Sequence, residues 1–171
     1  SPWVRLPLPW RRLPVVARDV RSLLRWPLGR LVRLALLAVV AGIAGRAAYD
    51  GTTPMVVVAG LALFLAGLDA AEPLGQELDH PTRRDALPRP AGYVHVRHLP
   101  AVVVVGLLVA LMAAAAGVLV DPVAGAWPAA LACVVPAGLG AASGAVVNLV
   151  MGAPPPAGTA SSAWNLAPPE A

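Results

Sequence analysis

The chain of 171 residues contains no lysine, a single cysteine and few charged side chains. Charged residues make up 13% of the sequence, whereas a soluble domain usually carries about 25%. This scarcity excludes a chain disordered by its charge, a nucleic-acid-binding module with a dense basic surface, and most soluble enzymes. Cys133 has no second cysteine to pair with, so an internal disulfide is excluded and the redox compartment is left open. We expect Cys133 to be a small, buried packing residue.

The sequence instead has long apolar runs. Hydrophobic residues make up 58% of the chain, and its mean hydropathy is +0.71. A helix of roughly 20 residues crosses the hydrocarbon core of a bilayer. Valine-rich stretches such as 102–105 would also suit strands, but lipid favours helices because their backbone groups are satisfied internally. The pattern predicts an all-α polytopic membrane helix bundle over 31–152, with four transmembrane helices at 31–49, 54–71, 99–120 and 123–152.

The distribution of arginine predicts the orientation of these spans. The connections at 50–53 and 121–122 contain no arginine, and positively charged residues stay on the cytoplasmic side. We therefore expect both termini and the 72–98 loop in the cytoplasm, with the chain in a bacterial plasma membrane, because an all-arginine cation set is typical of GC-rich bacterial genomes. Eleven of the thirteen arginines lie before the first span or in that loop: Arg5, Arg11, Arg12, Arg18, Arg21, Arg25, Arg30, Arg83, Arg84, Arg89 and Arg97.

The cytoplasmic segment 1–30 has an amphipathic pattern before the first span. At 100° per residue, apolar residues such as Val16, Val20 and Leu24 share one side of a helix, and arginines share the other. We predict an interfacial helix on the anionic inner leaflet. The alternative is that its apolar side packs on other helices of the same protein. The predicted membrane-surface residues are Arg18, Arg21, Arg25 and Trp26.

The tail at 153–171 is rich in proline, glycine and serine and is predicted to be a linker. Because it follows the fourth span directly, and because Ser1 is not methionine, we expect the chain to be a processed or excised piece. Its partners would then include the lipid bilayer and the remaining spans of a parent protein, or a second copy, and no nucleic acid.

The loop after the second span is polar, with short amphipathic pieces. Pro73 can start a short helix that has Leu74 and Leu78 on one face, and Pro81 ends it. We expect this segment to dock on a soluble cytoplasmic partner. The alternative is a solvated loop that satisfies its own charges, for example Asp85 with Arg83. The predicted docking residues are Glu72, Leu74, Glu77, Leu78, Asp79, His80, Arg83, Arg84 and Asp85.

Carboxylate and imidazole side chains gather around the same loop, which raises the possibility of a metal site. However, the chain has no His-Glu-x-x-His run, no paired-aspartate motif, no nucleophile–base pair and no phosphate-binding glycine loop. We therefore expect no catalytic residue, no metal, no cofactor and no enzymatic activity. His95 and His98 are expected at the membrane edge, and Asp69 and Glu72 at the level of the lipid headgroups. The residues concerned are Asp69, Glu72, Glu77, Asp79, His80, His95 and His98.

The fourth apolar run contains Gly140-x-x-x-Gly144, a spacing that lets two membrane helices approach closely. Chance matches are common in a sequence this rich in glycine and alanine. We expect the pair to support helix packing in general and not a specific dimer.

The block Ala-Glu-Pro-Leu-Gly-Gln-Glu-Leu-Asp-His-Pro at 71–81, which follows two spans and a basic interfacial segment, carries a resemblance. It resembles a poorly characterised family of large actinobacterial membrane proteins similar to ABC-2 type exporter permeases. The tail Pro168-Pro169-Glu170 resembles that family's connection to a following pair of spans. In ABC-2 permeases an amphipathic helix precedes the first span, and the loop between spans two and three contacts the ATP-binding subunit.

The resemblance implies that 72–87 is the coupling segment and 15–26 the interfacial helix. ABC-2 halves have six spans whereas four are expected here, so a transport path formed by this chain alone is in doubt. We expect a permease component, or fragment, of an ATP-driven ABC-type export system whose ATPase is a separate subunit. Two alternatives stay open: a structural or assembly membrane protein without transport activity, and a membrane metalloenzyme acting on lipid.

Overall fold

The computed structural model describes residues 21, 25–79, 91–123 and 125–152. Within these ranges the chain forms helices and turns, with no strand. The all-α class predicted from the apolar runs is therefore confirmed. The helices are α2 (Leu28–Tyr49), α3 (Met55–Ala70), α4 (Glu72–Asp79), α6 (Ala91–Val120) and α7 (Ala126–Met151).

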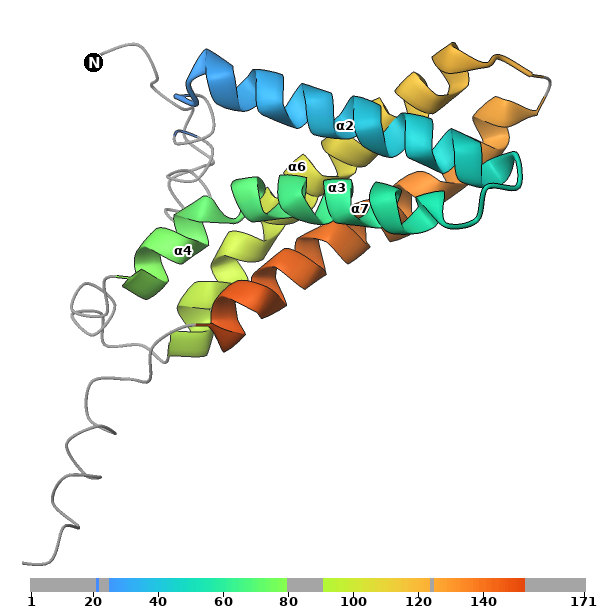
Figure 1. Ribbon diagram of the computed structural model, residues 1–171. Coiled ribbons are helices and arrows are strands. Elements are labelled where there is room, and N and C mark those ends of the chain that lie inside the picture. Colours follow the sequence, from blue (N-terminus) through green and yellow to red (C-terminus); the bar gives the residue numbers. More distant parts are fainter. Residues whose placement is uncertain (1–20, 22–24, 80–90, 124, 153–171) are drawn as a thin grey trace, which may run out of the picture.

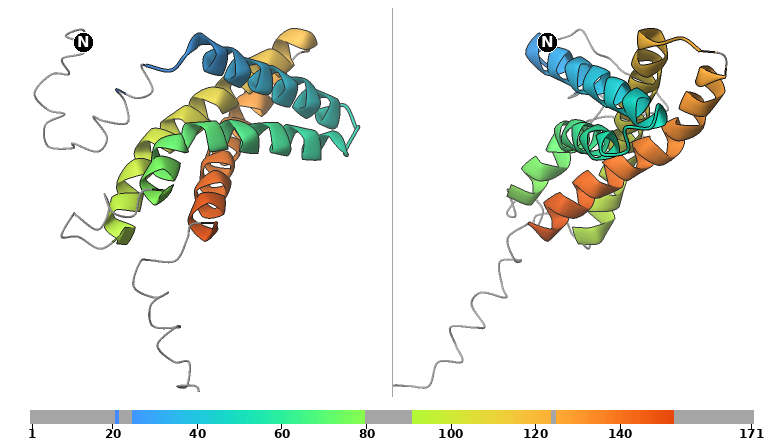
Figure 2. Two further views of the ribbon diagram at one scale, coloured as in Figure 1. Left: turned by 60° about the vertical axis from the view of Figure 1, so that its left-hand side comes forward. Right: turned by 45° about the vertical axis from the view of Figure 1, so that its right-hand side comes forward.

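The four long helices form two hairpins that lie against each other. The turn at 50–54 joins α2 to α3, and the turn at 121–125 joins α6 to α7. The α6–α7 hairpin crosses the α2–α3 hairpin obliquely, as the views in Figures 1 and 2 show. Both turns lie at one end of the bundle, which we call the turn end. The short helix α4 marks the opposite end, which we call the α4 end.

Within the described residues, three helical segments are long and apolar enough to cross a membrane: Leu28–Tyr49, His98–Val120 and Ala126–Met151. These helices indicate a membrane protein, with three candidate spans in the part of the chain that the structure describes. The segment predicted as the second span, 54–71, forms the 16-residue helix α3. At 1.5 Å per residue α3 is about 24 Å long, shorter than the roughly 30 Å hydrocarbon core of a bilayer.

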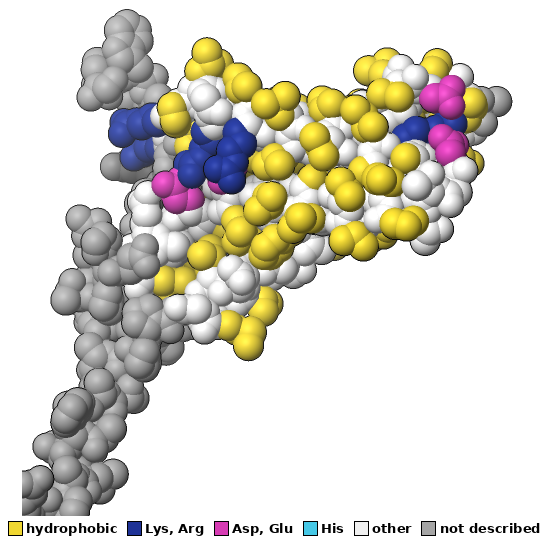
Figure 3. All heavy atoms as spheres, in the orientation of Figure 1, with side chains coloured by type: hydrophobic (Ala, Val, Ile, Leu, Met, Phe, Trp, Pro, Cys, Tyr) yellow, Lys and Arg dark blue, Asp and Glu magenta, His cyan; other side chains and the backbone are white. Residues whose placement is uncertain are grey.

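Large apolar side chains cover the outside of the bundle, and small ones fill the inside. On the face seen in Figure 3, apolar side chains cover the middle, while acidic and basic ones gather at the two ends. A soluble domain buries its large apolar residues, so this reversed arrangement suits contact with lipid. Much of the core is alanine: Ala38, Ala41, Ala62, Ala66, Ala70, Ala71, Ala113, Ala142 and Ala145.

Glycine allows the helix backbones to touch at three crossings. A Cβ added to Gly42 in α2 would overlap the carbonyl oxygen of Ala113 in α6. A Cβ on Gly67 in α3 would lie 2.5 Å from the carbonyl oxygen of Ala141 in α7. A Cβ on Gly106 in α6 would lie 2.8 Å from the carbonyl oxygen of Gly138 in α7. Small residues are what bring membrane helices this close.

The expected packing role of Gly140-x-x-x-Gly144 is wrong for its first residue. A Cβ on Gly140 would meet nothing within 4 Å, and one on Gly144 would make an ordinary contact, 3.4 Å from the ring of Phe64. The close contact of α7 with α6 falls instead on Gly138. Two residues turn a helix by about 200°, so Gly138 faces its neighbour while Gly140 faces away from it.

Most of the predicted interfacial helix at 15–26 lies outside the described residues, as do Arg18 and the linker at 153–171. Arg21 and Arg25 are exposed. Trp26, for which a place at the membrane surface stays a prediction, is partly buried and packs against the bundle core, with the Arg30 guanidinium 4.9 Å from the centre of its ring. Trp26 therefore anchors the start of α2 to the rest of the protein.

Candidate functional site

A charged cluster at the α4 end ties α2 to α3 and α4. Arg33 Nε lies 3.2 Å from Asp69 Oδ2 near the end of α3. Arg30 forms an ion pair with Glu72, the first residue of α4, and Gln76 Nε2 donates a 3.2 Å hydrogen bond to Glu72 Oε1. These contacts fix the first turns of α2 against the point where α3 gives way to α4.

Asp69 is the most enclosed carboxylate of this cluster. Its side chain is 12% exposed, and Oδ2 is buried without an aligned hydrogen bond, although Arg33 Nε is within ion-pair distance. The positive charge of Arg33 therefore offsets the negative charge of Asp69 without an aligned hydrogen bond. A buried carboxylate with no such partner would lower the stability of the protein. Asp69 is thus more enclosed than its expected headgroup position implies, whereas Glu72 is 39% exposed.

The short helix α4 separates the predicted docking residues into two groups. Leu74 is 0% exposed and Leu78 is 4% exposed, so both side chains belong to the protein's own interior. The expectation that these two leucines contact a partner is therefore wrong: α4 follows α3 after one residue, and this continuity lays its apolar face against the bundle. Gln76 lies on the exposed face of α4.

The remaining predicted docking residues lie partly or wholly outside the described part of the structure. Glu77 and Asp79 belong to α4, but their side chains lie outside the described part of the structure. The residues of the 80–90 stretch, which follow α4, also lie outside it: His80, Arg83, Arg84 and Asp85.

His98, expected at the membrane edge, is the first residue of the candidate span His98–Val120, and its side chain is 1% exposed. Helix α6 begins at Ala91, eight residues before the predicted span, so position 98 falls inside a continuous helix and faces the interior. The side chain of His95 lies outside the described residues. In the described ranges, no three His, Cys, Asp or Glu side chains come together as a metal site would require.

A second charged cluster lies at the turn end and is centred on Arg46 of α2. Arg46 Nε lies 3.0 Å from Asp50 Oδ2, and its terminal nitrogen lies 2.7 Å from Asp121 Oδ2. The Arg46 side chain is only 10% exposed, and its guanidinium lies 5.4 Å from the centre of the Tyr49 ring. Arg46 thus fastens the end of α2 to the turn between α6 and α7.

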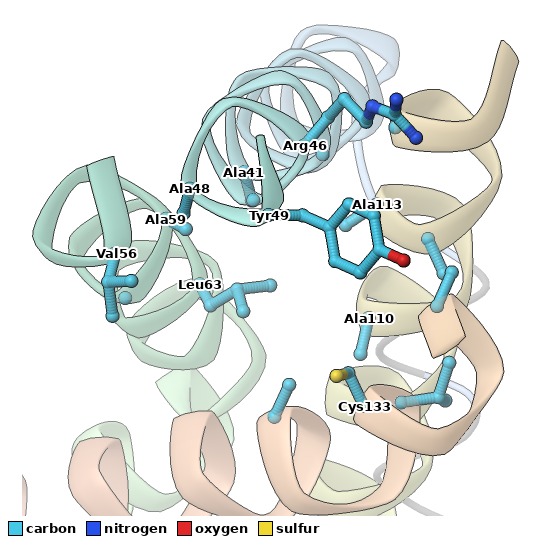
Figure 4. A pocket seen from close by; sticks show the side chains of 18 of the residues that line it. Ala41, Arg46, Ala48, Tyr49, Val56, Ala59, Leu63, Ala110, Ala113 and Cys133 are labelled. Carbon is cyan, nitrogen blue, oxygen red and sulfur yellow. The ribbon is translucent and has the colours of Figure 1, made fainter. Parts of the chain in front are cut away.

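An apolar cavity of about 770 Å³ lies between the two hairpins, next to this cluster. All four long helices line it, mostly with alanine, glycine and valine. Figure 4 shows the Tyr49 ring pointing into it from α2 and the Cys133 thiol from α7. Cys133 is exposed at this wall, so the expectation that it is a buried packing residue is wrong.

Sequence reasoning missed the cavity because small residues on four apolar runs indicate only that helices can approach closely. Whether two such faces touch or leave space depends on where the helices cross. The Arg46 pairing was missed because Asp121 lies 75 residues further along the chain. A usable signal was present, because both turn-end connections begin with an aspartate, Asp50 and Asp121.

Comparison of the chain with protein-family models, with curated proteins and with solved structures gave no match. The geometry of the two charged clusters, of α4 and of the cavity is therefore the basis for a functional assignment.

Proposed function

We propose that this chain is a permease component of an ATP-driven export system, with its α4 end docked on a separate ATP-hydrolysing subunit. The observation that carries the proposal is the attachment of α4. Buried Leu74 and Leu78 hold one face of α4 against the bundle, and the Arg30–Glu72 ion pair holds its start against α2. A helix fixed in this way moves together with the spans, which is what a partner's conformational change needs to reach them.

The proposed topology has four spans in a bacterial plasma membrane, with both termini in the cytoplasm. The short helix α3 would be the second of these spans in chain order, added to the three candidate spans, because it packs beside α2 and also contacts α6 and α7. The Arg33–Asp69 ion pair supports this, since it compensates the charge where α3 ends. The two arginine-free turns would face outward, and the α4 end would face the cytoplasm.

Single cysteines test this topology. We expect a membrane-impermeant maleimide to label Thr52→Cys on intact cells and Gln76→Cys only after permeabilisation, both in a Cys133→Ser background. Both positions are exposed, one in a turn and one on α4, so burial in the protein would not prevent labelling of either. In intact cells only the membrane would keep the reagent away from position 76. Full labelling of both variants in detergent is the control. Labelling of Gln76→Cys from outside intact cells would overturn the topology.

Charge reversal tests the docking. We expect the triple change Gln76→Arg, Arg83→Glu and Arg84→Glu to abolish copurification of an ATP-hydrolysing protein from native membranes. The changes alter the exposed face of α4 and the charges of the segment that follows it in the sequence, so the proposed docking surface would no longer match the charges of the partner. The unfolding temperature of the purified chain should stay the same.

The matched control is Thr52→Glu, which adds a charge at an exposed position of the opposite end. It should leave the ATP-hydrolysing protein bound. Docking is refuted if the ATP-hydrolysing protein and its coupled activity survive the triple change. If no such protein copurifies with the unaltered chain, a structural or assembly role takes the place of the permease.

A further inference from the structure

We propose that the cavity at the turn end binds one hydrocarbon chain of a membrane lipid from the adjacent leaflet. The site is separate from α4 and from any ATPase. The proposed lipid site can therefore be confirmed or refuted independently of the proposed permease function.

The cavity has the depth expected for a chain from one leaflet. Its wall runs from Tyr49, Val56 and Ala126, next to the two turns, to Gly42 and Ala141, near the middle of the helices. The backbone contacts of Gly42 with α6 and of Ala141 with Gly67 of α3 close it at that level. The space is thus confined to the half of the bundle nearest the turns, as one leaflet is confined to half of the bilayer.

The chemistry of the wall favours hydrocarbon over water. A buried water needs two to four polar partners. The wall offers the Tyr49 hydroxyl and the Cys133 thiol, while the guanidinium of Arg46 is already paired with Asp50 and Asp121. An empty space would leave the wall atoms without dispersion contacts on one side. A saturated chain restores those dispersion contacts and brings no polar group of its own that would need a partner.

The length of the cavity argues against a spanning protein helix as the occupant. Its lining covers only about two and a half turns of each of three helices, at 41–49 in α2, 56–64 in α3 and 110–118 in α6. A spanning helix needs roughly 20 residues. A cavity of about 770 Å³ instead falls within the roughly 300–1,000 Å³ typical of small-molecule sites.

The turn end also restricts the headgroup. Arg46 carries one positive charge and is paired with two carboxylates, so this cluster has a net charge of −1. An anionic headgroup would be repelled there. The Tyr49 hydroxyl is the polar atom that points into the cavity, so a zwitterionic or uncharged headgroup lies best beside it (Figure 4).

Photo-crosslinking tests the site. The purified chain is placed in nanodiscs of phosphatidylcholine, with a fraction of the lipid carrying a diazirine in the middle of one acyl chain. After irradiation, we expect crosslinks at Ala130, Cys133 and Ala137, which line the cavity, to exceed those at Leu131 and Leu139, which are exposed on α7 outside the cavity lining.

The double variant Gly60→Leu with Gly140→Leu fills the cavity, because both glycines line it and an added Cβ meets nothing within 4 Å at either position. It should lower the crosslinking at Cys133 several-fold and release one lipid in native mass spectrometry. The matched control is Gly29→Leu, where an added Cβ also meets nothing within 4 Å but which lies outside the cavity lining. It should change neither result.

Equal crosslinking of the cavity wall and the outer face of α7, unaffected by the filling variant, would overturn the proposal. A disulfide between the Cys133 residues of two copies, formed when a copper–phenanthroline oxidant is added to the same nanodiscs, would also overturn it, because a second copy would then occupy the cavity. Neither measurement needs an ATPase, so a failure here is distinguishable from a failure of the proposed permease function.

Discussion

Replacing Gly42 with alanine is expected to destabilise the bundle by about 1–3 kcal/mol. In an ordinary helix the same change is favourable by about 0.5–1 kcal/mol, because glycine loses more backbone entropy on folding. Here the added Cβ would overlap the carbonyl oxygen of Ala113 and lie 2.9 Å from the backbone nitrogen of Gly117. Both are backbone atoms, which cannot swing aside as a flexible side chain can. Relief of the overlap therefore requires α2 and α6 to separate.

The matched control is Gly140→Ala, the same substitution in a helix where the added Cβ meets nothing within 4 Å. It should leave the stability unchanged or raise it by up to about 1 kcal/mol. Reversible unfolding of the purified protein, by titrating sodium dodecyl sulfate into a mild detergent, measures both changes. The backbone contact of Gly42 is refuted if the two variants shift the free energy of unfolding in the same direction by the same amount.

Replacing Leu74 with alanine is expected to cost about 2–5 kcal/mol and to detach α4 from the bundle. Leu74 is fully buried, and an eight-residue helix is too short to hold its structure without packing. Hydrogen exchange at the backbone amides of α4 should therefore speed up more than exchange in the middle of α6. If α4 transmits motion between the spans and a cytoplasmic partner, coupled ATP hydrolysis should fall in the same variant.

Gln76→Ala is the control for Leu74→Ala, because Gln76 lies on the exposed face of the same helix. It removes one hydrogen bond to Glu72, and surface changes of this kind usually alter stability by no more than about 0.5 kcal/mol. Unchanged exchange in α4 after Leu74→Ala would show that the leucine does not anchor the helix. Faster exchange with full ATPase coupling would instead separate the anchoring of α4 from its proposed role.

The apolar runs predicted the long helices because an uninterrupted apolar run of roughly 18 residues or more is typical of a helix in a membrane. The third predicted span, 99–120, is confirmed by the candidate span His98–Val120, although the helix that contains it, α6, begins earlier, at Ala91. Apolarity marks where a helix enters lipid, and Leu99 and Pro100 begin the apolar part. A helix can continue past that point with polar residues, so hydropathy gives no signal for its true start.

The contacts between helices were not predictable in the same way. Arg33 with Asp69 joins the two helices of one hairpin, and Arg46 with Asp121 joins the two hairpins, so both pairings depend on how helices far apart in the sequence pack together. The cavity has the same origin. Alanine and glycine allow both close contact and open space, and the position of the crossing decides which of the two forms.

The length of α3 has a consequence for the membrane around it. As a proposed span of about 24 Å, α3 falls about 6 Å short of a typical hydrocarbon core. Lipids beside the α2–α3 hairpin then have to compress, at a cost of fractions of a kcal/mol for each ångström of mismatch. If α3 spans the membrane as proposed, the bilayer next to this hairpin is elastically strained, and shorter acyl chains relieve that strain. The protein would accordingly concentrate in the thinner regions of its membrane, and its distribution would depend on the acyl-chain length of the surrounding lipids.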